Sequence, residues 1–236
     1  MGKIYENWYN IHMSQISTRY TTEIKDAGDF LASAITKKLG EGKKVLLFLT
    51  GGSSIAVGIA LADILRKSEI GEKINNLTIT LTDERYGPVE HFNSNLFQLK
   101  EKGFDLPGAN IVPVLVDDDR DITTEKFNNF LKEELAKAEY KIGLFGVGAD
   151  GHTAGILPES VAVDTDKFAI GYDTPVFSRI TITPKTIEKL DEAVVWMQGK
   201  DKWPVLESLQ NEIPIQKQPA QVLKKIPLLT IFSDKK

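Results

Sequence analysis

The chain has 236 residues, a formal net charge of −4 and no cysteine. The lack of cysteine excludes disulfides and thiolate metal sites, and the mildly acidic balance argues against broad binding to nucleic acid or to an anionic membrane surface. Hydrophobic residues make up 42% and charged residues 26% of the chain, as in ordinary globular domains.

Nothing in the sequence indicates export or membrane insertion. Residues 1–20 carry Lys3, Glu6 and Arg19 and have no continuous apolar segment of the kind found in signal peptides. No run in the chain approaches the roughly 18 apolar residues of a membrane-spanning helix. We therefore expect a cytoplasmic protein without a membrane partner. A monomer or a small homo-oligomer is expected.

Helical and strand periodicities alternate along the chain. Asn93 or Ser94 is expected to cap the third helix, and Thr123 or Thr124 the fourth. In chain order the pattern predicts a helix over 17–39, a strand over 44–50, a helix over 54–67, a strand over 77–82, a helix over 94–102, a strand over 111–115, a helix over 123–138, strands over 141–145, 168–171 and 179–183, a helix over 184–190, a strand over 193–197, a helix over 202–210 and a strand over 228–232.

This alternation predicts an α/β fold, a modified Rossmann-like arrangement in which helices cover both faces of a mostly parallel sheet. We expect residues 1–236 to form a single domain. In such sheets ligands gather at the carboxyl ends of the strands. Three chemically rich segments fall at those ends, namely residues 50–54, 82–86 and 146–153.

The segment 146–153 combines glycines with an Asp150–His152 pair. Glycines let a ligand approach the backbone closely, and an acid two residues from an imidazole suits a general base with its orienting partner. The alternative is an ordinary glycine-rich turn that contains one histidine.

The other two segments indicate anion binding. Gly51 and Gly52 expose backbone N–H groups before a helix, and Ser53 adds a hydroxyl; a simple N-cap is the alternative. Arg85 follows Asp83 at the next strand end and suits bidentate contact with a phosphate or carboxylate. An internal salt bridge between the arginine and a carboxylate explains that segment equally well.

Together these motifs resemble the 6-phosphogluconolactonases, which share a superfamily with the glucosamine-6-phosphate deaminases. The resemblance covers the chain from about residue 45 to its last strand. It rests on segments of matching order and spacing: Thr50-Gly-Gly-Ser53, Asp83-Glu-Arg-Tyr86 with Ser94-Asn95, Gly146-Val-Gly-Ala-Asp150-Gly-His-Thr153, Arg179-Ile-Thr-Ile-Thr183 and Gly199-Lys-Asp-Lys202.

The resemblance implies hydrolysis of 6-phospho-D-glucono-1,5-lactone to 6-phosphogluconate, a step of the oxidative pentose phosphate pathway, without a metal or other cofactor. It assigns the base to His152, while Asp150 orients the imidazole or contacts sugar hydroxyls. Arg85 borders the lactone carbonyl or the phosphate. The phosphate and the rest of the substrate are assigned to Gly51, Gly52, Ser53, Asp83, Arg179 and Lys202.

Two other functions are considered for this fold. The deaminases of the superfamily carry a ring-opening glutamate just before a proline, where this chain has Leu157 before Pro158, and they usually lack an arginine at position 85. A non-catalytic sugar-phosphate sensor is the other possibility, although retention of Asp150 and His152 favours catalysis. The chain departs from the lactonase pattern at Ser54-Ile55 and near Ile156-Leu157, which leaves its exact lactone preference open.

Overall fold

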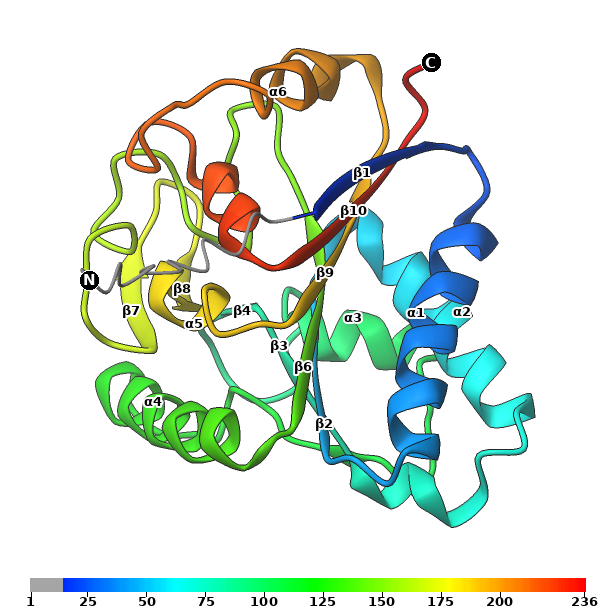
Figure 1. Ribbon diagram of the computed structural model, residues 1–236. Helices are drawn as coiled ribbons and strands as arrows, with labels where there is room; N and C mark the ends of the chain where they lie inside the picture. The colour runs from blue at the N-terminus through cyan, green and yellow to red at the C-terminus, as the bar shows by residue number, and fades with distance from the viewer. Residues whose placement is uncertain (1–14) are drawn as a thin grey trace, which may run out of the picture.

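The computed structural model describes residues 15–236 (Figure 1). Its strands are β1 (Gln15–Tyr20), β2 (Val45–Leu49), β3 (Leu77–Leu81), β4 (Asp83–Arg85), β5 (Asn110–Ile111), β6 (Tyr140–Gly146), β7 (Ala169–Asp173), β8 (Ser178–Ile182), β9 (Glu192–Met197) and β10 (Leu228–Ser233). Its α-helices are α1 (Ile24–Gly40), α2 (Ile55–Lys67), α3 (Asn95–Glu101), α4 (Arg120–Lys137), α5 (Pro184–Ile187) and α6 (Trp203–Ser208). Short 3₁₀ helices are η1 (Gly52–Ser54), η2 (Gly71–Asn76), η3 (Lys200–Lys202) and η4 (Pro219–Lys225).

Seven strands form one parallel sheet in the order β1-β10-β9-β6-β2-β3-β5. The interior strand β2 is the apolar run VLLFL, and all five of its residues are buried. Helices can cover both faces of a parallel sheet, which explains why this strand is apolar throughout rather than alternating. The predicted α/β fold with a mostly parallel sheet is confirmed.

The chain reverses its direction of travel across the sheet between β2 and β6. From β2 it proceeds to β3 and β5 on one side, and from β6 it proceeds to β9 and β10 on the other. The connections that leave the carboxyl ends of these two neighbouring strands therefore diverge, and they leave a crevice between them. The crevice lies where the sequence places Thr50 and Gly146.

A second sheet of three antiparallel strands, in the order β4-β8-β7, stands beside the large one. The sequence pattern predicts strands at β7 and β8 but no separate sheet for them, and it places Asp83–Arg85 only at the end of a strand. Pairing between Arg85 and Arg179 joins segments that are far apart in the sequence. Such non-local pairing leaves little trace in local periodicity.

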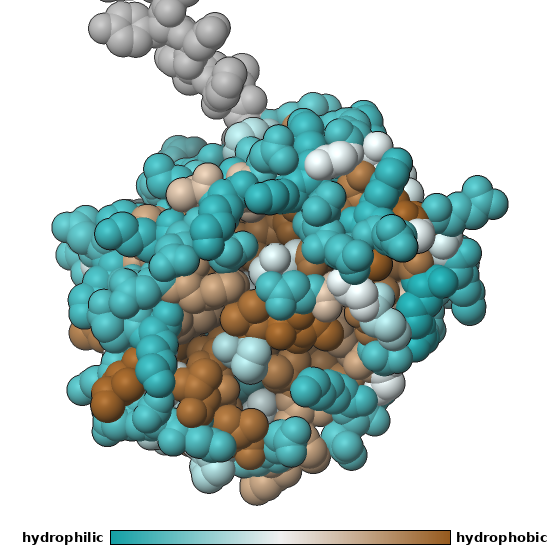
Figure 2. All heavy atoms as spheres, turned by 90° about the horizontal axis from the view of Figure 1, so that it is seen from below, coloured by the Kyte–Doolittle hydropathy of each residue, from teal (hydrophilic) through white to brown (hydrophobic). Residues whose placement is uncertain are grey.

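The helices form layers on the two sides of the large sheet. Figure 1 shows α1 and α2 side by side on one side of this sheet, and α4 with the small sheet on the other. Seen from below that view, hydrophilic side chains surround separate hydrophobic patches (Figure 2), which is usual for a protein surface. No helix within residues 15–236 is long and apolar enough to cross a membrane.

The helix predicted over 17–39 begins later, and its first part is wrong. Residues 15–20 form the edge strand β1, which pairs in parallel with β10 from Gln15–Leu228 to Tyr20–Ser233. Thr21 follows the strand, and its hydroxyl accepts the Glu23 N–H at 3.0 Å, just before α1 begins. Nearly every residue of β1 is exposed, so no alternation of buried and exposed side chains marked it as a strand.

Two smaller predictions also need correction. The strand expected over 111–115 ends early, since Val112 N–H still donates to Ile79 O at 2.8 Å but Pro113 has no N–H to continue the ladder. Helix α4 begins at Arg120 with Asp119 as its N-cap, which accepts the Asp121 N–H at 2.8 Å. The expected cap at Thr123 or Thr124 is therefore wrong. The cap of α3 is Ser94, whose hydroxyl accepts the Phe97 N–H.

Candidate active site

A cavity of about 290 Å³ opens at the carboxyl ends of β2 and β6. All three segments that the sequence placed at strand ends contribute to its walls, together with one residue from β8 and one from η3. Eight of the nine predicted site residues line it: Gly51, Gly52, Ser53, Asp83, Arg85, His152, Arg179 and Lys202. The ninth, Asp150, does not line the cavity but forms a hydrogen bond with His152, which does.

His152 and Asp150 form a hydrogen-bonded pair on the loop after β6. The imidazole Nδ1 lies 2.6 Å from Asp150 Oδ1, and the same oxygen accepts the backbone N–H of His152 at 3.1 Å. Gly148 provides the space for the ring, because a Cβ there would overlap the imidazole and lie 2.8 Å from Asp150 Oδ1. The side chains of His152 and Asp150 are 44% and 52% exposed, so water screens the attraction between them.

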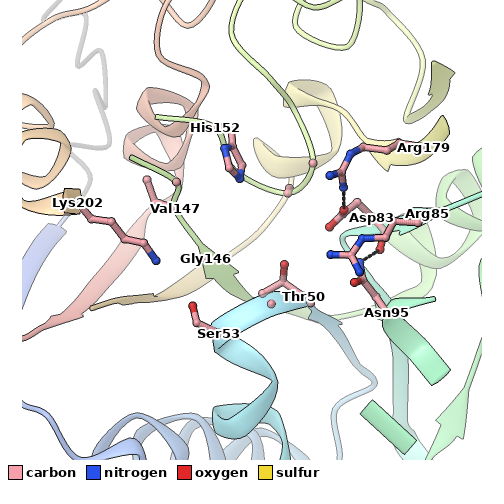
Figure 3. Close-up of a pocket in the computed structure, with 15 residues that line it drawn as sticks. Thr50, Ser53, Asp83, Arg85, Asn95, Gly146, Val147, His152, Arg179 and Lys202 are labelled. Carbon is pink, nitrogen blue, oxygen red and sulfur yellow. Dashed lines mark hydrogen bonds and ion pairs between the residues drawn. The ribbon is translucent and has the colours of Figure 1, made fainter. Parts of the chain in front are cut away.

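The pairing determines which imidazole nitrogen carries the proton. Partial burial raises the pKa of the Asp150 carboxyl, but the hydrogen bonds from His152 and the charge of its imidazolium form have the larger, opposite effect. The pKa of Asp150 therefore lies below its ordinary value. Because an ionised carboxylate only accepts hydrogen bonds, Nδ1 of His152 must donate. In the neutral imidazole this leaves Nε2 as the nitrogen with the lone pair, and Figure 3 shows the ring directed into the pocket.

The turn after β2 lets a ligand approach its backbone closely. Gly52 has a φ of +66°, a conformation that residues with a Cβ rarely adopt. Gly51 packs directly on the amide of Asn95, and an added Cβ would lie 2.9 Å from Asn95 Nδ2 and closer still to Oδ1. The turn runs through η1 into α2, so its N–H groups lie at the positive end of a helix dipole. These donors can bind an anion.

Three cationic side chains reach the cavity from two sides. Figure 3 shows Lys202 extending from one side above Ser53, with Arg85 and Arg179 on the other. Arg179 Nη1 donates to Asp83 Oδ2 at 3.0 Å. Neither Arg85 nor Lys202 forms an ion pair with a carboxylate in the part of the chain that the structure describes. The cavity therefore carries a net positive charge, as a site for an anionic ligand requires.

Asn95 lines the cavity, although the sequence did not predict it as a site residue. It is 2% exposed, its Nδ2 donates to Asp83 O at 3.0 Å, and its Oδ1 is buried without a hydrogen-bond partner. Its backbone N–H donates to the carboxylate of Glu84 at 2.6 Å. The signal that could have revealed it was present, since Asn95 belongs to the Ser94-Asn95 element of the resemblance.

The remaining histidines lie outside the cavity lining or outside the described residues. His91 Nε2 lies 2.9 Å from Arg85 O and supports the loop after β4 without lining the cavity. His12 lies outside the described residues. Within residues 15–236, no three His, Cys, Asp or Glu side chains gather as a metal site. The expectation that the reaction needs no metal or other cofactor stays a prediction.

The position at which a deaminase carries its ring-opening glutamate does not face the cavity. Leu157 is partly buried against the hydrophobic core, and its N–H donates to the Tyr172 hydroxyl at 3.3 Å. Glu159, two residues later, is exposed and also lies outside the cavity lining. No carboxylate from this segment is thus in place to reach a bound sugar.

The sequence profile of the family described as glucosamine-6-phosphate isomerases/6-phosphogluconolactonase matches residues 21–230. The chain belongs to this family. Among its curated relatives, a 6-phosphogluconolactonase of Haemophilus influenzae is 27% identical over 174 residues, which cover 71% of this chain and 74% of the relative.

Solved structures confirm the fold. A 6-phosphogluconolactonase from Shewanella baltica has a TM-score of 0.76 at 21% identity, over 94% of this chain and 99% of that one. A monomeric glucosamine-6-phosphate deaminase has the same TM-score of 0.76 at 17% identity, over 93% and 97% of the two chains. Both activities therefore occur on this architecture, and only the residues of the site can distinguish them.

Proposed function

We propose that this protein is a 6-phosphogluconolactonase, which hydrolyses 6-phospho-D-glucono-1,5-lactone to 6-phosphogluconate. The observation that carries the proposal is the His152 imidazole at the wall of a cavity that three cationic side chains also line. The names of the curated relatives support the same activity. The reaction would place the protein in the oxidative pentose phosphate pathway, and the cytoplasmic location stays a prediction from the sequence.

In the proposed reaction, Nε2 of His152 takes a proton from a water molecule as the water oxygen attacks the lactone carbonyl. Asp150 holds the ring in the required tautomer and stabilises the imidazolium that forms. The tetrahedral intermediate then collapses, the bond from the carbonyl carbon to the ring oxygen breaks, and the imidazolium returns the proton to that oxygen. A histidine is suited to this double role because its unperturbed pKa of about 6.5 lies near neutrality.

We assign the phosphate to the turn of Gly51, Gly52 and Ser53, with Lys202 and Arg179 as its cationic partners. The turn offers N–H donors at the start of α2, and the two cations approach from opposite sides of the cavity. Asp83 balances part of the charge of Arg179 until a ligand arrives.

Arg85 is assigned to the wall near the reacting end of the substrate, where it stabilises the oxyanion or borders the phosphate. Its Nη1 donates to Asn93 O at 3.0 Å, while its buried Nε has no partner. A guanidinium with donors still free is suited to receive an oxygen that gains charge in the transition state.

A lactone hydrolysis assay coupled to 6-phosphogluconate dehydrogenase tests the activity, with the spontaneous reaction subtracted. Wild type is expected to exceed the background, and His152→Ala to lose about 10²–10⁴-fold in kcat. Equal rates above background for the two proteins would contradict the role of His152. Ammonia release from glucosamine-6-phosphate would favour the deaminase function instead, and binding without turnover would favour a sensor.

The phosphate assignment has its own test. Lys202→Ala and Arg179→Ala are expected to raise KM for the phosphorylated lactone by about 10-fold or more, because each removes a charged hydrogen-bond donor. Unphosphorylated D-glucono-1,5-lactone is the matched control, since its hydrolysis should not depend on Lys202. Unchanged KM values for the phosphorylated lactone would place the phosphate elsewhere.

A further inference from the structure

Two guanidinium groups on the cavity wall share one aromatic ring. The guanidinium carbon of Arg85 lies 4.9 Å from the centroid of the Phe177 ring, and that of Arg179 lies 5.5 Å from the same centroid. Both distances fall within the range of about 6 Å in which the face of an aromatic ring attracts a cation. Phe177 does not itself line the cavity.

The register of the small sheet explains this grouping. Arg85 on β4 and Arg179 on β8 are direct cross-strand partners, so their side chains project from the same face of the sheet. Phe177 precedes Arg179 by two residues, and its side chain therefore projects from this face as well. The antiparallel pairing continues to this end of the sheet, because Tyr86 N–H donates to Ser178 O at 2.8 Å.

Hydrogen bonds within the turn between β7 and β8 fix the backbone of Phe177. Phe177 N–H donates to the Thr174 hydroxyl at 3.0 Å, and Thr174 N–H donates to Phe177 O at 2.8 Å. These bonds close the connection between β7 and β8. The ring thus has a defined backbone position from which to contact both arginines.

The arginine pair needs such support because like charges directly opposite one another destabilise a sheet. Asp83 forms an ion pair with Arg179, with 3.0 Å between Oδ2 and Nη1, but not with Arg85. Within residues 15–236, Arg85 has no carboxylate partner, and the Nε atoms of both arginines are buried without hydrogen bonds. The Phe177 ring contacts the guanidiniums of both arginines.

We propose that Phe177 is a positioning residue for substrate binding, whose ring holds the guanidiniums of Arg85 and Arg179 at the cavity wall. The inference rests on the proposed function in that it takes the ligand to be a phosphorylated sugar acid or its lactone. The ring orders both side chains before the ligand arrives, so less conformational entropy is lost on binding. Specificity for an anionic substrate therefore depends on an aromatic residue outside the cavity lining.

The test compares Phe177→Leu with Phe177→Tyr. Leucine keeps an apolar side chain on the turn but removes the π face, whereas tyrosine preserves that face. Phe177→Leu is expected to raise both KM for the phosphorylated lactone and Kd for 6-phosphogluconate, measured by calorimetry, by about 5- to 20-fold. Phe177→Tyr should stay within about twofold of wild type. Val176→Ala is the control on the same turn, since Val176 is 75% exposed.

Thermal unfolding of all variants separates this role from a purely structural one. Equal affinities for Phe177→Leu and Phe177→Tyr, whether both unchanged or both weakened, would overturn the inference, as would a wild-type protein that does not bind 6-phosphogluconate. Failure of the proposed function has a different signature. Wild type would then bind 6-phosphogluconate without hydrolysing the lactone, and weaker binding by Phe177→Leu alone would still support the role of the ring.

Discussion

Replacement of Gly148 by alanine should disable the proposed base without removing any functional group. The glycine lies beneath the imidazole of His152, and its backbone φ is not positive, so alanine is compatible with the chain conformation there. The added methyl group would overlap Cε1 and Nδ1 of the ring and lie 2.8 Å from Asp150 Oδ1. Gly148→Ala therefore displaces the catalytic pair and leaves the rest of the cavity in place.

The size of the effect follows from these contacts. Ordinary contact of a Cβ begins at 3.4 Å, so the carboxylate must move by about 0.6 Å and the more closely overlapped ring by roughly 1 Å. A misplacement of about 1 Å can cost about 10²-fold in rate. The ring is also half-exposed and can turn toward solvent, so the free energy of unfolding should change by no more than about 1 kcal/mol.

Steady-state kinetics with the phosphorylated lactone test this expectation, with Gly40→Ala as the matched control. An added Cβ at Gly40 meets nothing within 4 Å, so that variant should retain wild-type kcat. Gly148→Ala is expected to lower kcat by about 10²-fold with KM within about threefold. Retention of kcat within threefold, in a protein for which His152→Ala is inactive, would refute the reasoning that the ring must occupy this position.

Three further predictions concern buried or paired carboxylates. Asp150→Asn is expected to lower kcat by about 10- to 100-fold, less than His152→Ala, because the amide still orients the half-exposed ring but does not stabilise its cation. The test is to measure kcat of the two variants as a function of pH. Burial raises the pKa of Glu84, although its four hydrogen bonds oppose the shift, so its contribution to stability is full below the unfolded value near 4.5 and is lost as pH rises through the folded pKa. Urea unfolding between pH 4.5 and 7 should accordingly show wild type losing stability relative to Glu84→Gln as pH rises, and a constant difference would contradict this. Arg179→Met should destabilise the protein by about 3 kcal/mol in thermal unfolding, since it leaves Asp83 buried and unpaired, and Asp83→Asn in the same chain should recover part of that loss.

Local patterns were sufficient to predict the buried strands of the large sheet and the helix that follows β1. The run VLLFL and the helical spacing of Leu31, Ile35 and Leu39 reflect burial of the elements themselves, and burial leaves a periodic trace in the sequence. The Gly-Gly-Ser turn was likewise recognisable, because a positive φ at Gly52 depends on local backbone sterics. The segments that fall at strand ends could therefore be named as candidate site residues from the sequence.

Elements held by distant partners could not be predicted in the same way. The exposed strand β1 pairs with β10 at the other end of the chain, and Arg85 pairs with Arg179 across almost a hundred residues. Neither pairing has a local periodicity to reveal it. Asn95 belongs to a recognisable motif, but its place at the cavity wall depends on the packing of α3 against the turn after β2.

Local sequence patterns were enough to establish the α/β class, the order of the buried elements and the residue types available for catalysis, because these depend on periodic burial and on short turns. Which of those residues meet depends on the tertiary structure. It paired Asp83 with Arg179, left Arg85 without a carboxylate partner within residues 15–236, and placed Asp150 behind His152 rather than on the cavity wall. These outcomes depend on the geometry of strands that join distant parts of the chain, and no short segment contains that information.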